Sequence, residues 1–177
     1  KSLINKVKNQ SLKLKQSIYV EKFGDPSLNP YSLQTKKLKE IVKNENHQRI
    51  PIKVSDRERI KGSIPYYGAS GIIDHVNNFT HKGERLLIGE DGANLISRST
   101  PIAFIAKGSF WVNNHAHIIQ SKNKNENRFF MYLINSLNWS LDARGSTRDK
   151  LGQDDLMNKI IKIPKSNEER IKISEAI

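Results

Sequence analysis

The middle of the chain alternates between short apolar runs and clusters of turn-forming residues. Runs of this length, rich in Ile, Val and Phe, are typical of β-strands. Glycines and Asn/Asp clusters separate them, as at residues 89–92 and 113–114. In the first cluster we expect a tight turn in which Gly92 supplies a positive φ. The predicted strands are residues 71–76, 85–88, 101–106, 110–112 and 115–120.

Apolar residues spaced three and four apart predict helices toward the two ends of the chain. One helix follows the predicted strands, with its apolar face between Phe130 and Leu141. The first twenty residues contain neither Gly nor Pro, and their apolar seam has the spacing of a coiled coil. An ordinary amphipathic helix that packs on the domain is the alternative. The seam residues are Ile4, Val7, Ser11, Leu14 and Ile18.

The last residues predict the start of another helix. Pro164 closes a strand-like run at residues 160–163. Ser166 and Glu169 then have the spacing of a capping box, in which the hydroxyl accepts a first-turn N–H and the carboxylate reaches back to the cap. Ile173 begins an apolar stripe after this cap. We therefore expect helix at both ends of a central domain.

These elements together predict an α+β fold, a β-rich domain flanked by helical arms that would belong to a long coiled coil. The first arm would cover residues 1–22 and the domain residues 23–165. The second arm would begin within residues 166–177. Inside the domain, residues 36–42 are either a short helix or a strand, and residues 43–63 form a polar stretch.

The charge of the chain is strongly positive. Thirty Lys and Arg residues against eighteen Asp and Glu give a net charge of +12, which attracts polyanions such as nucleic acid. An anionic membrane is the second candidate partner, but no apolar run approaches the roughly 20 residues of a spanning helix. The chain has no cysteine, which excludes disulfides, thiolate zinc sites and a Cys nucleophile. We expect a cytoplasmic protein.

The first residue is Lys1 rather than Met, and no apolar segment with a small-residue cleavage site follows it. We therefore expect no signal peptide, and a chain that is either a segment of something longer or a processed product.

Local catalytic motifs are missing from the sequence. It contains no Glu-x-Lys or Asp-x-Lys step of a common restriction nuclease, no phosphate-binding G-x-x-x-x-G-K-[ST] loop and no G-x-S-x-G elbow. It also lacks the Asn/Asp-Pro-Pro-aromatic motif of an amino-methyltransferase. We therefore expect no catalytic residues and no metal site in this chain.

Two pairs of residues could still suggest a metal site. Glu90 and Asp91 lie at a strand end, and His115 and His117 alternate along a predicted strand and so would face the same side. We favour a tight turn for the acids. For the histidines we favour a structural or DNA-facing role, because no Cys or clear third ligand is near them.

Polar and basic loops offer recognition chemistry instead. Arg forks suit guanine edges and phosphate oxygens, and Asn suits adenine edges. A solvated side chain is the alternative for each residue taken alone, but together these loops favour contact with the edges of DNA bases. The glycines, Tyr66 and Tyr67 are expected to hold the fold. The candidate DNA-binding residues are Arg57, Arg59, Lys61, Ser70, Asn94, Ser97, Arg98, Asn113, Asn114, His115, Arg144, Ser146, Thr147, Arg148 and Lys150.

Five blocks of sequence carry a family resemblance. They are residues 23–30 (FGDPSLNP), 64–72 (IPYYGASGI), 86–94 (LLIGEDGAN), 110–117 (FWVNNHAH), and 145–151 (GSTRDKL) with the segment up to residue 173. Spread over nearly the whole chain, they resemble the target recognition domain of type I restriction–modification specificity subunits. The chain departs from the usual family pattern at Asp149-Lys150, where Pro is common, and at Arg170, where Gln is common. These positions concern turn rigidity and the start of the helix.

The resemblance implies a division of labour. Such a domain would read one half of a split site in double-stranded DNA, and its helical arms would set the spacing and dock methyltransferase subunits. Methyl transfer from S-adenosylmethionine and ATP- and Mg-dependent cleavage would belong to the modification and restriction partners. The chain would be a piece of a two-domain subunit, or a half-length subunit that forms a homodimer.

Two other classes of protein remain as alternatives. One is the DNA-recognition domain of a fused restriction–methylation enzyme, which a methyltransferase site upstream in the same gene would reveal. The other is a self-contained metal-dependent nuclease that uses Glu90, Asp91 and the histidines.

Overall fold

The structure is a computed structural model that describes residue 10 and residues 32–123, 125–139 and 150–176 of the 177-residue chain. The predicted coiled-coil arm at residues 1–22 lies outside the described residues, apart from Gln10, which is helical. None of the described helices is long and apolar enough to cross a membrane.

The described chain combines runs of consecutive strands, β3–β6 and β7–β9, with separate helices, so the predicted α+β class is confirmed. The predicted strands at residues 71–76, 85–88 and 110–112 are present. Residues 36–42, predicted as helix or strand, contain the end of one strand, a helical turn and the start of the next strand. The elements are β1 (Leu33–Lys37), α2 (Leu38–Ile41), β2 (Val42–Asn44), η1 (Asn46–Gln48), α3 (Val54–Arg59), β3 (Lys61–Gly68), β4 (Gly71–Val76), β5 (His81–Lys82), β6 (Arg85–Gly89), α4 (Gly92–Ser97), β7 (Ala103–Ala106), β8 (Ser109–Val112), β9 (Ala116–Ser121), α5 (Asn127–Ser136), α6 (Gln153–Asn158), β10 (Ile160–Pro164) and α7 (Asn167–Glu175).

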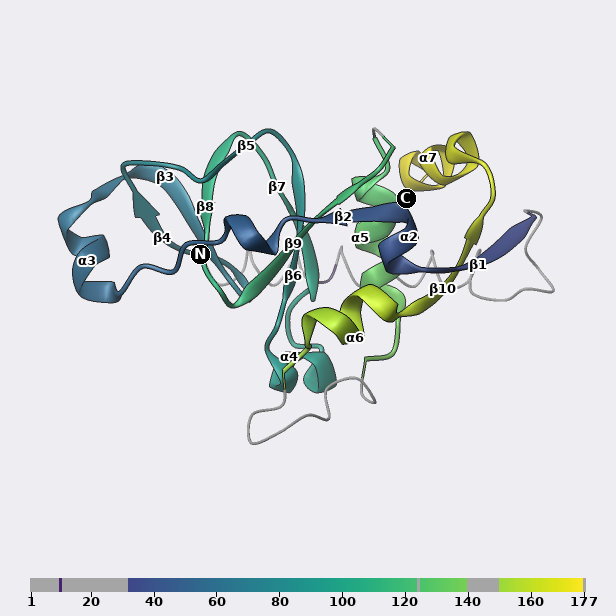
Figure 1. Ribbon diagram of the computed structural model, residues 1–177, viewed down its shortest axis with the longest axis horizontal. Helices are drawn as coiled ribbons and strands as arrows, with labels where there is room; N and C mark the ends of the chain where they lie inside the picture. The colour runs from purple at the N-terminus through teal and green to yellow at the C-terminus, as the bar shows by residue number, and fades with distance from the viewer. Residues whose placement is uncertain (1–9, 11–31, 124, 140–149, 177) are drawn as a thin grey trace.

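The strands form two four-stranded sheets and a two-stranded ribbon. The central sheet has the strand order β2-β9-β6-β7 and is antiparallel. The second sheet has the order β4-β3-β8-β5 and is mixed, because β3 and β8 run parallel. β1 and β10 pair antiparallel, with Leu33 opposite Pro164. Figure 1 shows the second sheet at one end of the molecule and this ribbon at the other.

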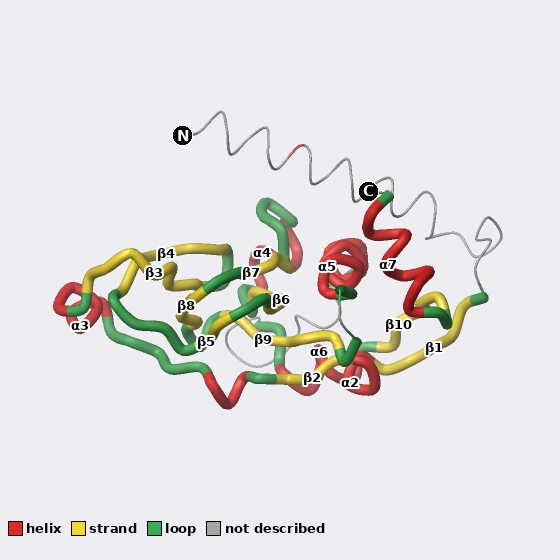
Figure 2. The backbone as a smooth tube through the Cα atoms, turned by 90° about the horizontal axis from the view of Figure 1, so that it is seen from above, coloured by secondary structure: helices red, strands yellow, loops and turns green. Residues whose placement is uncertain are grey.

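The central strand β6 is apolar on both faces because it lies between two cores. Leu86 and Ile88 face the larger cluster around α5, whereas Leu87 belongs to a smaller cluster with Phe110 and Ile118. Successive strand residues face opposite sides of a sheet, which explains an unbroken apolar run here instead of alternation. Helix α5 therefore covers one face of the central sheet and the second sheet covers the other (Figure 2).

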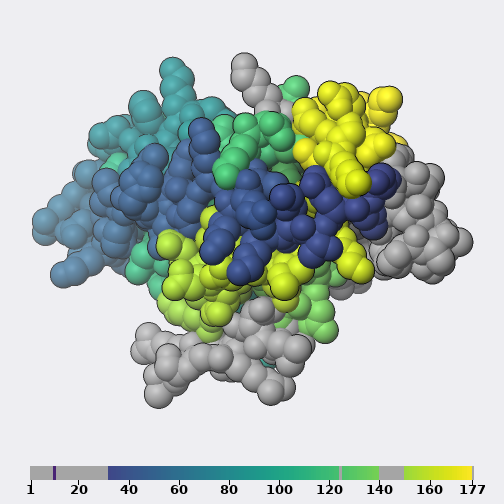
Figure 3. Space-filling view, turned by 45° about the vertical axis from the view of Figure 1, so that its right-hand side comes forward, coloured from purple at the N-terminus to yellow at the C-terminus, as the bar shows by residue number. Residues whose placement is uncertain are grey.

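Three short connections carry the chain between the two four-stranded sheets. One leads from β5 to β6 through Gly83, whose φ is +100°. Glycine adopts this backbone conformation without the steric clash that a Cβ atom would cause. The N–H of Gly83 donates to the carbonyl of Gly108, at 2.8 Å. Another connection leads from β8 to β9 through residues 113–115. A third short connection leads from β7 to β8 through residues 107–108. β1, α2, β2 and η1 cross another face of the molecule beside α6 and β10 (Figure 3).

The predicted polar stretch at residues 43–63 contains the end of β2, η1, helix α3 and the start of β3. Helix α3 has no buried residue, so no apolar periodicity marks it in the sequence. The first three residues of β3 are also exposed, and the strand becomes buried only from Tyr66 onward. The prediction that Arg57, Arg59 and Lys61 lie in a loop is therefore wrong, because an exposed helix and an exposed strand end carry the same polar residues as a loop.

The predicted ends of two helices need correction. α5 stops at Ser136, with Leu137 as its C-cap, so Leu137 does not continue the helical face. Leu141 lies outside the described residues. At α7, the cap forms as predicted, since the Ser166 hydroxyl accepts the N–H of Glu169. However, the carboxylate that meets this hydroxyl is that of Glu168.

A buried asparagine carries the contact between α5 and β7. The Oδ1 atom of Asn135 accepts hydrogen bonds from the backbone N–H groups of Ile102 (2.9 Å) and Ala103 (3.0 Å). Its Nδ2 atom donates to the carbonyl of Ala103, at 2.8 Å. Asn135 is only 3% exposed. Removing its amide would leave the buried N–H groups of Ile102 and Ala103 without the acceptor that they have here, which costs free energy.

We expect Asn135→Ala to lower the free energy of unfolding by about 2–4 kcal/mol, because it leaves buried N–H groups unpaired. Urea denaturation measures this loss. Asn158→Ala is the matched control: its exposed amide donates to the carbonyl of Asp154, and its loss should cost less than about 0.5 kcal/mol. A similar loss in both variants would contradict the prediction.

Candidate nucleic-acid interface

Four segments that are far apart in the sequence meet at one place. They are the β3–β4 turn, the β6–α4 connection, the β8–β9 turn and the segment before α6. A Cβ atom on Gly89 would lie 2.3 Å from the carbonyl oxygen of Ala69, so only glycine lets the β3–β4 turn approach β6 this closely. The N–H of Asn113 donates to the carbonyl of Tyr67, at 3.0 Å. The first contact places the β3–β4 turn against the end of β6, and the second joins the β8–β9 turn to β3.

The same strand end is bonded to the segment before α6. The N–H of Glu90 donates to the carbonyl of His115 (3.0 Å), and the N–H of Leu151 donates to the carbonyl of Glu90 (3.1 Å). Asp91 and Lys150 form an isolated antiparallel bridge. The Nζ atom of Lys150 lies 3.5 Å from Nδ1 of His115. Backbone hydrogen bonds therefore fix the relative positions of these segments.

Polar side chains gather where the segments meet. Ser70, Asn114, His115 and Lys150 are exposed there, whereas Asn113 is buried and its Oδ1 accepts the N–H of His115, at 2.8 Å. We call these five residues the junction surface. All five were predicted from the sequence as DNA-binding residues, and the structure brings them together.

A buried asparagine lies beneath the junction surface. The Oδ1 atom of Asn46 accepts the N–H of Ile118 (2.8 Å), and its Nδ2 donates to Oε1 of Gln153 (2.8 Å). Nδ2 also lies 2.8 Å from Nδ1 of His117. Asn46 thus joins η1 to β9 and α6. Sequence analysis missed this residue, because it falls in the polar stretch and its partners lie 71 and more residues away.

An ion pair completes this buried layer. Nη1 of Arg49 lies 2.6 Å from Oε1 of Glu90, and the two side chains are 18% and 12% exposed. The same Nη1 donates to the carbonyl of Ala116, at 3.1 Å. Nδ1 of His117 lies 3.6 Å from the Glu90 carboxylate. Glu90 therefore supports the fold through a charged partner that local sequence could not reveal, since Arg49 lies 41 residues away.

His117 is held as a neutral imidazole. Its Nε2 atom lies 2.9 Å from the carbonyl oxygen of Leu151, which can only accept, so Nε2 carries the hydrogen. Nδ1 then accepts from the amide of Asn46. Burial lowers the pKa of His117, while the Leu151 hydrogen bond and the Glu90 charge act in the opposite direction. Both ring nitrogens are thus satisfied without a proton on Nδ1.

The connection after β6 differs from the predicted turn. Asp91 is the N-cap of α4, and its Oδ1 accepts the N–H of Ala93, at 3.0 Å. Gly92 is the first helical residue, and it is not among the described glycines with positive φ. The prediction of a positive φ at Gly92 is therefore wrong: the cap satisfies a first-turn N–H, and the chain enters the helix directly.

Two predicted DNA-binding residues hold the fold around α4 instead of lying in a loop. Asn94 is buried; its Oδ1 accepts the N–H of Thr100 (2.9 Å) and its Nδ2 donates to the Thr100 carbonyl (3.0 Å). Arg98 caps α4 with a φ of 53°. Its guanidinium donates to the carbonyls of Asn135 and Leu137 at the end of α5. These contacts use the groups that base recognition needs, so their geometry favours a structural role.

The basic residues near α3 lie apart from the junction surface. Lys61 begins β3 and Ser70 follows its end, so the strand separates them by about 25 Å. Arg57 and Lys61 both contact the carboxylate of Asp74, at 2.8 and 2.7 Å. These hydrogen bonds, that of Lys61 first, hold the pKa of Asp74 well below its usual range. The Arg59 side chain is 81% exposed and is the one of these three basic residues best placed for a phosphate.

The remaining candidates are divided between α4 and the part of the chain that is not described. Ser97 is exposed at the end of α4, and its hydroxyl donates to that of Ser99, at 3.4 Å. The other candidates lie outside the described residues; they are Arg144, Ser146, Thr147 and Arg148.

The described residues contain no group of three or more His, Cys, Asp or Glu side chains that could hold a metal ion. β9 begins at Ala116, so His115 lies in the turn before it, whereas His117 is buried within the strand. The two histidines therefore do not share a strand face, contrary to the expectation from their spacing.

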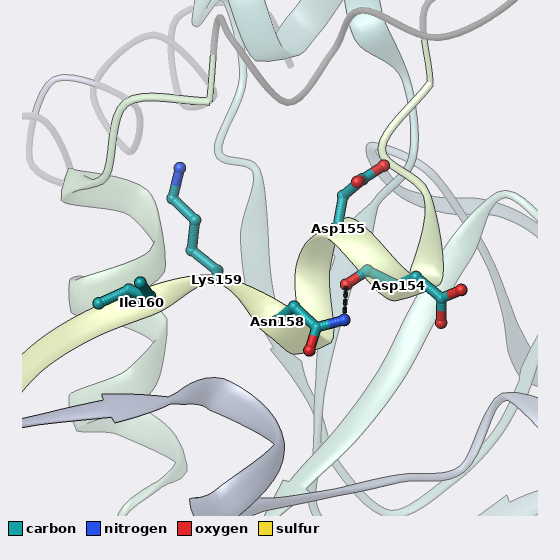
Figure 4. Close-up of a pocket in the computed structure, with 5 residues that line it drawn as sticks. All are labelled: Asp154, Asp155, Asn158, Lys159 and Ile160. Atoms are coloured by element: carbon teal, nitrogen blue, oxygen red, sulfur yellow. Dashed lines mark hydrogen bonds between the residues drawn. The ribbon is translucent and has the colours of Figure 1, made fainter.

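A pocket lies where α6 ends and β10 begins. Its volume is about 430 Å³. Figure 4 shows the amide of Asn158 turned back to the carbonyl of Asp154, at 3.0 Å, and the Lys159 side chain extended away from the helix. None of the candidate DNA-binding residues in the described part of the chain lines the pocket, whose described lining residues are Asp154, Asp155, Asn158, Lys159 and Ile160.

Comparison with known proteins identifies one family. Residues 30–177 match the family described as the type I restriction modification DNA specificity domain. A Haemophilus influenzae protein provisionally named a type I restriction enzyme specificity subunit is 38% identical over 143 residues, which cover 80% of this chain and 36% of that protein. The chain thus spans about a third of that relative's length. The resemblance inferred from the sequence is confirmed.

Solved structures share the fold at lower identity. A structure described as the basis of complex assembly and conformational transition of the type I R-M system has a TM-score of 0.65 and 16% identity, and covers 99% of this chain and 46% of that chain. The type I restriction-modification S subunit from M. genitalium has a TM-score of 0.61 and 17% identity, with 98% and 46% covered. The HsdS subunit from Thermoanaerobacter tengcongensis has a TM-score of 0.59 and 16% identity, with 99% and 45% covered.

We expect the free energy of unfolding to fall as the pH drops from about 7 toward 5. Burial holds the pKa of His117 below the ordinary 6.5, so the unfolded chain binds more protons in this range than the folded one. Burial lowers the pKa of His81 in the same way. The two neutral histidines therefore make their full contribution to the free energy of unfolding above pH 6.5, and this contribution is lost as the pH falls below that value.

Urea denaturation at several pH values tests this expectation. His117→Gln should be less stable than the wild type at pH 8, and its stability should depend less on pH between 7 and 5, because one of the two contributing groups is gone. His81→Gln should also flatten the dependence. An unchanged pH dependence in His117→Gln would contradict the account of the buried layer.

Proposed function

The chain belongs to the family of type I restriction modification DNA specificity domains, and from this premise we propose that it reads one half of a split DNA site through the junction surface. The observation that carries the proposal is the convergence of polar side chains from separate segments on one backbone-bonded, buried support. Base recognition needs donors and acceptors at fixed positions. The junction surface has this property among the described residues.

The chemistry of the junction surface suits mixed contacts with bases and phosphates. Asn114 offers an amide for a base edge, Ser70 offers a hydroxyl, and Lys150 offers a positive charge. The two nearby acids are already used within the protein, since Glu90 pairs with Arg49 and Asp91 caps α4. The repulsion that free carboxylates would exert on DNA is thereby reduced.

Partners would supply the chemistry of the complex. The chain spans about a third of its Haemophilus relative, and the missing length would hold a second recognition domain or be replaced by a second copy of this chain. We propose that this chain has no catalytic function. It would direct methyltransferase subunits that carry S-adenosylmethionine, and through them restriction subunits that use ATP and Mg. Helical arms that dock these partners would begin at α7.

We expect the chain to bind duplex DNA with a steep dependence on salt, because its net charge is +12. If it contacts about five phosphates, the logarithm of the binding constant should fall against the logarithm of salt concentration with a slope of about −4 to −5. Fluorescence anisotropy titrations at several salt concentrations measure this slope. A flat titration would remove the electrostatic basis of the proposal.

A single substitution at the junction surface should alter base preference without harming the fold. We expect Asn114→Ala to remove about 1–3 kcal/mol of discrimination at one base position, because an exposed amide that reads a base edge is lost. The melting temperature should stay close to that of the wild type. Binding to the cognate half-site and to all its single-base variants measures the preference.

Asn78→Ala is the matched control, because this exposed Asn bonds only the N–H of the next residue among the contacts in the described chain. It should leave base preference unchanged. Arg98→Ala, in contrast, should lower stability, because its guanidinium bonds the end of α5. If Asn114→Ala keeps the wild-type base preference, the junction surface is not the reading surface.

A further inference from the structure

A buried ion pair joins α7 to the rest of the domain. Nε and Nη2 of Arg170 lie 2.7 and 2.6 Å from Oε1 of Glu126. The two side chains are only 6% and 1% exposed. Moving two charged side chains from water into the protein interior costs free energy. Replacing a buried ion pair with apolar residues of similar size often gives equal or greater stability. Its presence therefore points to a need for a fixed geometry at this position.

Both partners are further restrained by hydrogen bonds. Nη1 of Arg170 donates to the carbonyls of Pro164 and Lys165, the second at 3.0 Å. The other carboxylate oxygen of Glu126 accepts the hydroxyl hydrogen of Ser121, at 2.6 Å. A planar guanidinium makes all these bonds in one orientation only. The position of α7 is thus specified by direction as well as by distance.

The pair lies where four elements meet. Glu126 is the N-cap of α5 and follows β9, whereas Arg170 lies in the first half of α7, just after β10. Figure 2 shows α7 beside α5. Within α7, all of which is described, the buried residues are Arg170, Ile173 and Ser174, so Ile173 is the one buried apolar side chain. A single buried apolar side chain does not fix the rotation or the sliding of α7 relative to α5. The ion pair between Arg170 and Glu126 restricts both movements.

We propose that the Glu126–Arg170 ion pair locks the direction in which α7 leaves the domain, and so sets where this domain's half-site lies relative to the other half of the split site. The second clause rests on the proposed function, whereas the lock itself does not. Glu126 and Arg170 are positioning residues in this scheme, since they lie in the interior and touch no base.

Distance measurements between two spin labels test the lock directly. The chain has no cysteine, so Lys172→Cys on α7 and Lys82→Cys on β5, both exposed, take labels at these two sites alone. We expect a narrow distance distribution in the labelled parent chain. In Glu126→Gln the distribution should broaden or shift, because the amide cannot hold the guanidinium as the carboxylate does.

A second variant separates loss of the lock from loss of the fold. Arg170→Lys keeps the buried charge opposite Glu126, but its ammonium lacks the planar fork that bonds the carboxylate and the two carbonyls together. It should retain cooperative unfolding and still show the broader distribution. Glu40→Gln is the control, because it removes the same charge from an exposed pair with Lys36. It should keep the parent distribution, and a parent distribution in folded Arg170→Lys would overturn the proposal.

Spacer preference in the intact subunit, assembled with its partners, tests the consequence for DNA. A change of one base pair moves a half-site by about 3.4 Å and by about a tenth of a turn. We expect this change to weaken binding of the wild type by at least about tenfold, and of Arg170→Lys by less than about threefold. Base preference within the half-site should be unchanged in the variant.

The outcomes distinguish the two proposals. If the wild type reads its half-site but Arg170→Lys has the same spacer penalty, the link between the lock and spacing is overturned. If Arg170→Lys loses base preference as well, the ion pair supports the domain as a whole and the positioning role is overturned. If the wild type itself shows no base preference, the proposed function fails, and the spin-label distances still decide whether α7 is locked.

Discussion

Buried polar groups with one possible set of partners determine how the distant segments of this domain meet. A buried group without a partner costs more than a hydrogen bond usually contributes. Asn46 and His117 can therefore satisfy their side chains only when η1, β9 and the segment before α6 lie in one arrangement. Apolar cores such as those around β6 tolerate small shifts. The layer of buried polar residues does not tolerate such shifts. The exposed turns bonded to it are therefore held in fixed positions.

The sequence predicted elements whose residues show their environment locally. The run Leu86–Ile88 is apolar because both faces of β6 are covered, and Ser166 has the local spacing of a cap. Elements with no buried face escaped prediction, as α3 did, because polar residues in an exposed helix resemble those of a loop. The register of β1 with β10 was equally hidden, since it joins residues at opposite ends of the domain.

Residue type predicted part of the candidate site but could not separate recognition from support. Asn114 and Asn94 are both asparagines that the sequence placed in loops, yet the first is exposed and the second is bonded to Thr100. Arg170 looked like a departure that concerned only the start of a helix. Its partner Glu126 lies 44 residues away, and no spacing rule connects the two. Distinctions of this kind arise from tertiary contacts alone.

The close approach of Gly89 to Ala69 has a consequence for how such a domain can evolve. Any side chain at Gly89 would collide with backbone, whereas Ser70, next to that contact, is exposed to solvent. Mutational tolerance therefore changes abruptly between neighbouring positions. Ser70 and Asn114 are exposed, so substitutions there remove no buried contact. If the junction surface reads DNA as proposed, selection can change the target sequence at these positions while the supporting residues stay constant. With that function, a lineage would acquire a different DNA target through a few point mutations without first gaining spare stability.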